Sequence, residues 1–247
     1  MKIKVINPNT TVSMTEKIGA IARSVANPGT TIIACNPDMG PASIEGHYDE
    51  ALSVVGILDE IRKGEAEGID GYIIACFGDP GLLAARELAT APVIGIAEAA
   101  MHAASFVATG FSIVTTLNRT KIIARHLVDN YGMTHLCRQI RAIDLPVLSL
   151  ETDSEIKTLI LEECRRALAE DDCGAIILGC GGMADLATLI SDKLGIPVID
   201  GVSAAVKFTE ALVGLQLSTS KTGDLAYPIA KPHIGILSTF TPRRSPN

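Results

Sequence analysis

The sequence has no tryptophan, few aromatic residues and no excess of positive charge. Only 4% of its 247 residues are aromatic, and 28 Asp and Glu outweigh 21 Lys and Arg to give a net charge of −7. Such a chain repels the phosphates of nucleic acids and the surfaces of anionic membranes. We therefore expect a small molecule as its ligand and neither nucleic acid nor a membrane as a partner.

Long hydrophobic runs and the features of a secretory signal are also absent. Every apolar run is well short of the ~18 residues that cross a bilayer, and the start, MKIKVINPNT, leads directly into a strand-like segment. No Cys-x-x-Cys pair or His/Cys cluster has the spacing of a zinc site. We therefore expect the six cysteines to be free thiols of a cytosolic protein that binds no metal.

Short apolar runs of strand length recur along the chain and alternate with helix-length segments. They read KIKVI, TTIIAC, YIIAC, PVIGI, FSIVT, IRAID, AIILG and PVIDG. This alternation is typical of parallel sheets whose strands are joined by helices. With 47% apolar residues, the chain can bury a large core.

One stretch of the chain is repeated. CFGDPGLLAARELATAPVIGIAEAA at 76–100 matches CGGMADLATLISDKLGIPVIDGVSAA at 180–205, and the cysteine-to-proline spacings are 16 and 17 residues. A period this long indicates duplicated domains. We predict an α/β fold of two pseudo-symmetric lobes, each a four-stranded parallel sheet flanked by helices. Residues 1–97 plus 204–247 would form the first lobe and 98–203 the second, with an active site in the cleft between them.

Polar and reactive side chains follow the predicted strands. In open parallel sheets, ligands bind beyond the carboxyl ends of the strands. The residues at these ends are Asn7, Asn9, Thr10 and Cys76 in the first unit, and Thr115, Thr116 and Cys180 in the second. If the two lobes face each other, both cysteines point into one cleft.

Two facing thiols can invert a carbon centre. One removes a proton from carbon as a thiolate, and the other returns a proton to the opposite face. Asp79-Pro80 predicts that a helix begins just after Cys76, and a helix N-terminus would lower the pKa of the thiol. Backbone amides of the glycine-rich turns would stabilise the developing negative charge. This chemistry needs no cofactor.

Four motifs carry a resemblance to a known family. INPNT at 6–10, GPASIEG at 40–46, CFGDPG at 76–81 and GCGGM at 179–183 resemble the hydantoin racemase branch of the aspartate/glutamate racemase superfamily, and its allantoin racemases in particular. The resemblance extends from Lys2 to about Lys231. It implies a cofactor-independent racemase of 5-monosubstituted hydantoins that forms a homo-oligomer and uses Cys76 and Cys180 as its catalytic pair.

The resemblance also assigns the substrate contacts. The residues expected to hold the ring are Asn9, Ser43, Gly78, Thr115, Thr116, Gly181 and Gly182, with Ile44 and Phe77 as apolar walls. The scarcity of aromatic residues favours a small polar substituent, such as the ureido group of allantoin. Amino acid racemases of the superfamily typically follow their two cysteines with Asn-Thr and Thr-Glu. Here Phe77-Gly78 and Gly181-Gly182 stand instead, which leaves room for a ring.

Three other functions stay open at this point. The chain could be an amino acid racemase, an arylmalonate-type decarboxylase or a cytosolic two-lobed binding protein in which the thiols are incidental. A decarboxylase would need one acid thiol, so the presence of both cysteines argues against it.

Other residues have competing interpretations. Residues 179–184 match a dinucleotide fingerprint with Asp200 as the ribose acid, but too few residues follow for the rest of a nucleotide-binding sheet, so we interpret the match as chance. Cys35 is interpreted as structural or as pocket wall. His47 and Tyr48 are candidates for contact with a ligand substituent or for a solvated helix start, and His102 for a packed helix.

Overall fold

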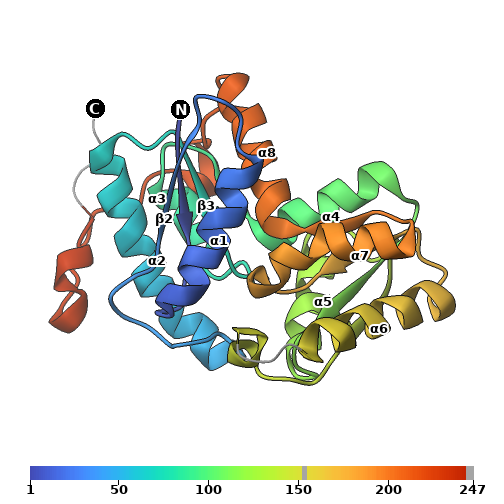
Figure 1. Ribbon diagram of the computed structural model, residues 1–247. Coiled ribbons are helices and arrows are strands. Elements are labelled where there is room, and N and C mark those ends of the chain that lie inside the picture. Colours follow the sequence, from blue (N-terminus) through green and yellow to red (C-terminus); the bar gives the residue numbers. More distant parts are fainter. Residues whose placement is uncertain (152–154, 243–247) are drawn as a thin grey trace.

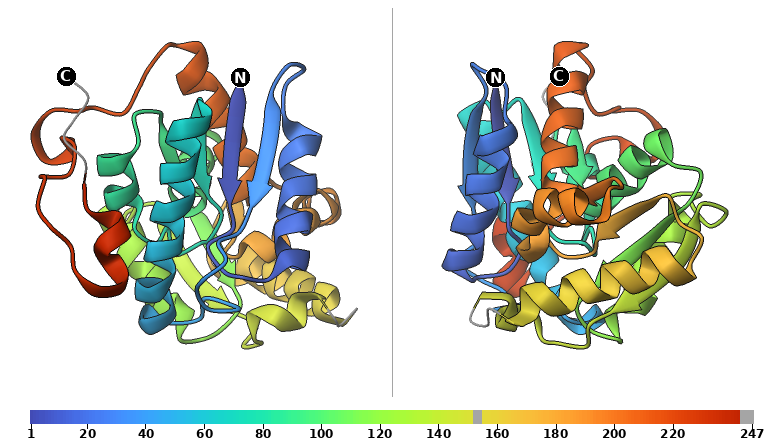
Figure 2. Two further views of the ribbon diagram at one scale, coloured as in Figure 1. Left: turned by 90° about the vertical axis from the view of Figure 1, so that its left-hand side faces the viewer. Right: turned by 45° about the vertical axis from the view of Figure 1, so that its right-hand side comes forward.

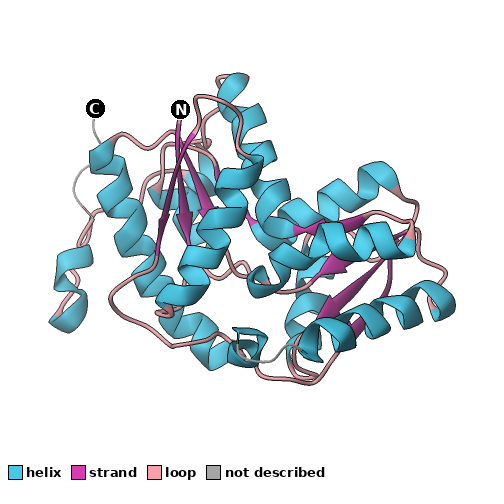
Figure 3. Ribbon diagram, in the orientation of Figure 1, coloured by secondary structure: helices cyan, strands magenta, loops and turns pink. Residues whose placement is uncertain are grey.

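The computed structural model describes residues 1–151 and 155–242, whose strands form two four-stranded parallel sheets (Figures 1 and 3). The first sheet, in the order β2-β1-β3-β4, contains β1 (Lys2–Ile6), β2 (Thr31–Cys35), β3 (Gly71–Ile74) and β4 (Val93–Gly95). The second, in the order β6-β5-β7-β8, contains β5 (Phe111–Thr115), β6 (Cys137–Ala142), β7 (Ala175–Leu178) and β8 (Val198–Asp200). The same order occurs twice, so the predicted fold class is confirmed.

Helices cover both faces of the first sheet. They are α1 (Val12–Val25) and α8 (Gly201–Gly214) on one face, and α2 (His47–Glu67) and α3 (Leu82–Leu88) on the other. Ile3 and Val5 point toward α1 and α8, whereas Ile6 lies in the cluster with α2 and α3. This alternation follows from the two-residue period of a strand, and it explains why a strand buried on both faces reads as a continuous apolar run.

The second sheet is covered in the same way. Its helices are α4 (Ile96–Val107) and α5 (Thr120–Asn130) on one face, and α6 (Glu155–Glu170) and α7 (Ala187–Leu194) on the other. Two short 3-10 helices, η1 (Val147–Glu151) and η2 (Gly181–Leu186), lie at the end of this sheet that faces the first unit. The helix η2 contacts α1 as well as β7.

The last helix of each unit packs on the other sheet. α4 follows β4, but most of its buried residues pack on the second sheet, whereas α8 follows β8 but packs on the first. The two helices also pack against each other. We therefore retain, as a proposal, the division into 1–97 plus 204–247 and 98–203. Residues 152–154 and 243–247 of these predicted lobes lie outside the described residues.

The chain after α8 runs along the outside of the first unit (Figure 2). Lys221 Nζ donates to the Arg86 carbonyl oxygen at 2.6 Å, and the Arg62 guanidinium lies 4.7 Å from the centre of the Phe240 ring. This segment includes η3 (Gly223–Leu225) and η4 (Gly235–Phe240). Among the described residues, no helix combines the length and the hydrophobicity needed to cross a bilayer.

The junction of α4 and α8 depends on a glycine. A Cβ atom added to Gly201 would lie 2.3 Å from the carbonyl oxygen of Ile96, a backbone atom that cannot move unless α4 moves. We expect Gly201→Ala to lower the free energy of unfolding by about 2–3 kcal/mol, measured by urea denaturation. Gly214→Ala is the control, because nothing lies within 4 Å of its added Cβ. Equal stability of the two variants would contradict this account of the junction.

Candidate active site

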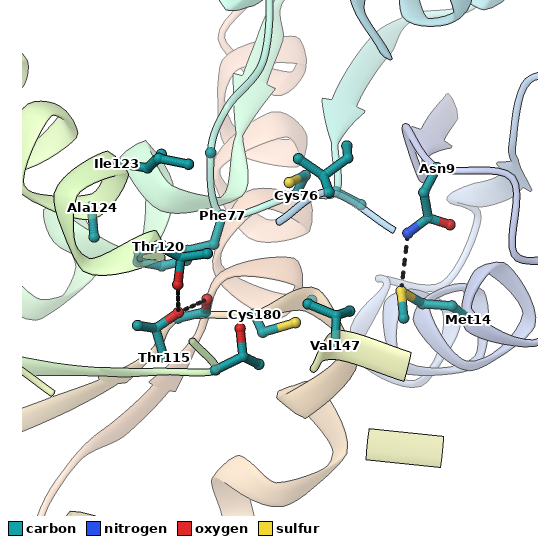
Figure 4. A pocket seen from close by; sticks show the side chains of 16 residues that line it. Asn9, Met14, Cys76, Phe77, Thr115, Thr120, Ile123, Ala124, Val147 and Cys180 are labelled. Atoms are coloured by element: carbon teal, nitrogen blue, oxygen red, sulfur yellow. Dashed lines mark hydrogen bonds between the residues drawn. The ribbon is translucent and has the colours of Figure 1, made fainter. Parts of the chain in front are cut away.

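A pocket lies between the carboxyl ends of the two sheets (Figure 4). The first unit contributes Asn9, Met14, Ile44, Ala75, Cys76, Phe77 and Gly78, and the second contributes Thr115, Thr116, Thr120, Ile123, Ala124, Val147, Gly179, Cys180 and Gly181. None of these lining residues has a charged side chain. The pocket therefore suits a neutral ligand with hydrogen-bonding groups better than an ionic one.

The two cysteines reach this pocket from equivalent positions in the two sheets. Cys76 follows β3 by two residues and Cys180 follows β7 by two residues, and each of these strands is the third in its sheet. Figure 4 shows their side chains on opposite walls of the pocket. Both are free and partly exposed. The structure thus brings together two thiols that are 104 residues apart in the sequence.

The turn after Cys76 differs from the expected helix start. α3 begins only at Leu82, because Asp79 and Gly81 both have positive φ angles, 43° and 66°, and interrupt the helical conformation. The backbone N–H of Asp79 donates to the carbonyl oxygen of Cys76 at 3.0 Å and closes the turn. Cys76 is therefore not at a helix N-terminus, whereas Cys180 directly precedes the 3-10 helix η2.

The expected lowering of the thiol pKa values is wrong. Burial raises the pKa of Cys180 to about 11, although the Gly182 backbone amide and the charge of Lys17 act in the opposite direction. Burial also raises the pKa of Cys76, and the amide of Gly78 opposes this only in part. Loss of hydration thus outweighs the backbone dipoles on which the prediction was based.

The side-chain amide of Asn9 has a fixed orientation. Its Oδ1 accepts hydrogen bonds from Asn7 Nδ2 at 2.8 Å and from the Thr11 backbone N–H at 2.9 Å. Its Nδ2 must then be the atom directed toward Met14, where the thioether sulfur lies at 3.2 Å (Figure 4). A thioether is a weak acceptor, so this amide can donate to a carbonyl oxygen of a ligand.

The threonines of the second unit are held in place by their hydrogen bonds. Thr115 Oγ1 donates to the Gly179 carbonyl oxygen at 3.0 Å and lies 3.3 Å from Thr120 Oγ1. Thr120 Oγ1 also donates to the Leu117 carbonyl oxygen at 2.8 Å. These bonds connect β5 to the strand end that carries Cys180.

Two of the residues expected to hold the ring do not line the pocket. Ser43 is half-buried and is the chain neighbour of Ile44, which does line the pocket. Gly182 lies next to the Cys180 thiol, since a Cβ atom added to this glycine would be 3.7 Å from Cys180 Sγ. Several residues that line the pocket were not predicted from the sequence, namely Met14, Ala75, Thr120, Ile123, Ala124, Val147 and Gly179. Most of these supply apolar surface from helices or loops, for which the strand-end pattern contains no signal.

The other candidate residues lie elsewhere. Cys35 contacts the cluster of Lys4 and Glu60, where burial raises its pKa to about 12, and it does not line the pocket. His47 Nδ1 lies 3.1 Å from Glu50 Oε2, and its ring stacks on His126. The remaining two are His102, whose Nδ1 contacts the Glu98 carbonyl oxygen within α4, and the exposed Tyr48.

Asp200 has a structural role at the start of α8. Its Oδ1 accepts from the Ser203 backbone N–H at 2.8 Å, so it caps this helix. The residues after Gly179 form the 3-10 helix η2 and not the α-helix that a dinucleotide fingerprint opens. Both observations agree with the interpretation of that match as chance.

Asp79 connects the turn of Cys76 to the second unit. Its carboxylate accepts from the backbone N–H groups of Ala97 and Glu98 at 3.0 and 2.9 Å, and from the Tyr131 hydroxyl at 2.7 Å. It therefore caps α4, whereas the sequence had predicted that it caps the helix directly after Pro80. An added Cβ at Gly95 would lie 2.2 Å from the Asp79 carboxyl carbon, so only glycine leaves room for this carboxylate.

Asp79 predicts a dependence of stability on pH. Burial raises its pKa from 3.8 to about 7, although the hydrogen bonds from Tyr131, Ala97 and Glu98 oppose the shift. The folded chain thus holds the Asp79 proton more tightly than the unfolded chain does. The contribution of this proton to the free energy of unfolding is therefore complete below pH 3.8 and is lost as the pH rises through about 7. We expect the stability of the wild type relative to Asp79→Asn to fall over this range in urea denaturation series. A pH-independent difference would contradict this assignment.

Comparisons with known proteins agree with the geometry. The family description Asp/Glu/hydantoin racemase matches residues 3–209. A hydantoin racemase of Pseudomonas sp. (strain NS671) is 51% identical over 241 residues, which cover 97% of each chain. The structure of an allantoin racemase from Klebsiella pneumoniae is 60% identical, with a TM-score of 0.97, over 98% of this chain and 100% of that one. An allantoin racemase from Pseudomonas fluorescens is 40% identical, with a TM-score of 0.92, over 95% and 100%.

These matches span nearly the whole chain and confirm the resemblance found in the four motifs. They also decide between an enzyme and a binding protein, because a relative that is 51% identical and a solved structure that is 60% identical, each over nearly the whole chain, are racemases. The chain therefore belongs to the Asp/Glu/hydantoin racemase family and is an enzyme of that family.

Proposed function

We propose that the chain is a cofactor-independent racemase of 5-monosubstituted hydantoins, with allantoin as its preferred substrate. The observation that carries the proposal is the presence of Cys76 and Cys180 on opposite walls of one pocket (Figure 4). The names of the relatives support the substrate, since they are racemases of hydantoins and of allantoin.

In the proposed reaction, the thiolate of one cysteine removes the proton from C5 of the ring. The resulting carbanion is delocalised into the adjacent carbonyl as an enolate, and the thiol of the other cysteine gives a proton to the opposite face. Asn9 Nδ2 is a suitable donor to an enolate oxygen because its own partner is only a thioether sulfur. The burial that raises the thiol pKa values reduces the thiolate fraction but makes each thiolate a stronger base for a carbon acid.

The uncharged wall of the pocket favours a ring over an amino acid. An α-amino acid presents an ammonium and a carboxylate, and burying these without charged partners is costly. The described lining has no charged side chain but offers Asn9, Thr115 and Thr116. A neutral hydantoin ring matches these groups through its carbonyl and N–H groups. A decarboxylase would use a single thiol and would leave the second without a role.

We further propose that the enzyme acts in purine catabolism in the cytosol. Allantoin arises in purine catabolism, and the six cysteines are all free, which agrees with a reducing cytosol. The net charge of −7 opposes binding to nucleic acid.

Substitution of either pocket cysteine tests the role of the two thiols. We expect Cys76→Ser and Cys180→Ser each to lower the rate of racemisation of a single allantoin enantiomer by about a hundredfold or more, because a hydroxyl is too weak a base at neutral pH. The loss of optical rotation measures this rate. Cys35→Ser is the matched control, since this free thiol also ends a strand but lies away from the pocket, and it should retain the wild-type rate. Wild-type rates in both pocket variants would refute the two-thiol mechanism.

We also propose a homo-oligomer, supported by exposed apolar side chains near the C-terminus. Ile229, Ile234 and Ile236 are 78%, 87% and 95% exposed, which is unfavourable for an isolated chain in water. We expect light scattering of the full chain to give a multiple of 25.9 kDa, and the double variant Ile234→Ser/Ile236→Ser to shift it toward a single chain. A monomeric wild type would contradict this part of the proposal.

A further inference from the structure

The charged groups outside the pocket wall differ between the two thiols. The charged side chains that act on Cys180 are Lys17 from α1, which favours its thiolate, and Glu45, which disfavours it. Three groups raise the pKa of Cys76 when they are ionised, namely Cys180, Asp79 and Glu50. Burial raises the pKa of both thiols, but these neighbours add to the shift at Cys76, whereas Lys17 reduces it at Cys180.

Lys17 is held against the turn that follows Cys180. Its Nζ donates to the Gly182 carbonyl oxygen at 2.6 Å and pairs with Asp185 in η2 at 2.8 Å. Gly182 is the residue whose added Cβ would lie 3.7 Å from Cys180 Sγ. Gly182 therefore separates the Lys17 ammonium group from the Cys180 thiol. A second lysine, Lys157 of α6, lies 3.9 Å from Asp185 and partly balances its charge.

Cys76 has carboxyl groups near it in place of a lysine. Glu50 lies beside the turn after Cys76, because an added Cβ at Gly78 would be 2.8 Å from Glu50 Oε1. The carboxylate of Asp79 belongs to the same turn and is buried. Its hydrogen-bond partners, Tyr131 and two backbone amides, carry no positive charge.

We propose that Lys17 is a positioning residue that makes Cys180 the more acidic of the two thiols, so that Cys180 is the thiolate and Cys76 the thiol whenever one of the pair is ionised. The inference rests on the proposed function, which it deepens. Lys17 does not line the pocket, so it acts on Cys180 through the electric field and through the Gly182 turn and does not touch the substrate.

Because the favoured ionised form has its thiolate at Cys180, the two enantiomers are converted by different sequences of steps. An enantiomer whose C5–H faces Cys180 reacts directly: the Cys180 thiolate takes the proton from carbon, and the Cys76 thiol gives its proton to the opposite face. The product then leaves a Cys180 thiol and a Cys76 thiolate. One proton must pass from Cys180 to Cys76 through solvent before the favoured form of the ionised pair is restored. The opposite enantiomer is bound by the minor form of the free enzyme.

Alkylation of the full chain tests the proposal, because iodoacetamide reacts with thiolates. We expect peptide mass spectrometry to show Cys180 modified about tenfold faster than Cys76 at neutral pH, since one pKa unit corresponds to a tenfold change in thiolate fraction. Lys17→Met should slow the reaction of Cys180 by a similar factor and move its midpoint to higher pH, with Cys76 unchanged. Lys17→Arg should restore the preference for Cys180.

Lys157→Met is the matched control. This lysine pairs with the same aspartate, but at 3.9 Å and with a side chain that is 57% exposed, so its removal should leave the preference for Cys180 in place. Faster modification of Cys76 in the wild type, or an unchanged midpoint for Cys180 in Lys17→Met, would overturn the proposal. Labelling requires no turnover, so its outcome is separate from that of the racemisation assay: a chain labelled first at Cys180 that does not racemise hydantoins would contradict only the proposed function.

Discussion

The proposed chemistry depends on holding two partly buried thiols, each at the end of a different sheet, on opposite walls of one pocket. Neither sheet can do this alone, since each contributes one sulfur atom and about half of the pocket wall. Because α4 and α8 each pack on the sheet of the other unit, hydrophobic core contacts fix the position of one unit relative to the other. The Asp79 carboxylate, which connects the Cys76 turn to α4 and Tyr131, adds a polar tie across the same junction.

The charged residues that act on the two thiols do not line the pocket but lie outside its wall. The described lining is neutral, and Lys17, Glu50, Asp79 and Glu45 lie one layer further out. A neutral wall avoids the cost of burying charge against a neutral ring, while charges in the next layer still act strongly through a medium of low dielectric constant. In the proposed mechanism, one set of residues would select the substrate and a different set would determine the distribution of the protons.

The sequence was most informative where local pattern and structure coincide. Buried parallel strands read as continuous apolar runs, and the repeat around Cys76 and Cys180 placed both cysteines at equivalent strand ends. The sequence was least informative where the outcome depends on distant parts of the chain. Asp79 was expected to cap its own helix but caps α4, and the pKa of each thiol is dominated by burial that only the assembled pocket creates. No local signal links Lys17 to Gly182, which is 165 residues away.

The central claim is that two groups, and not one, exchange protons with the same carbon. Racemisation of one allantoin enantiomer in deuterated water tests this most directly, with mass spectrometry of both separated enantiomers at early times. With two thiols, the newly formed enantiomer carries deuterium at C5 while the remaining starting enantiomer keeps its hydrogen. Product that retains the original hydrogen, or deuterium that enters both enantiomers equally from the start, would show a single base and contradict the account.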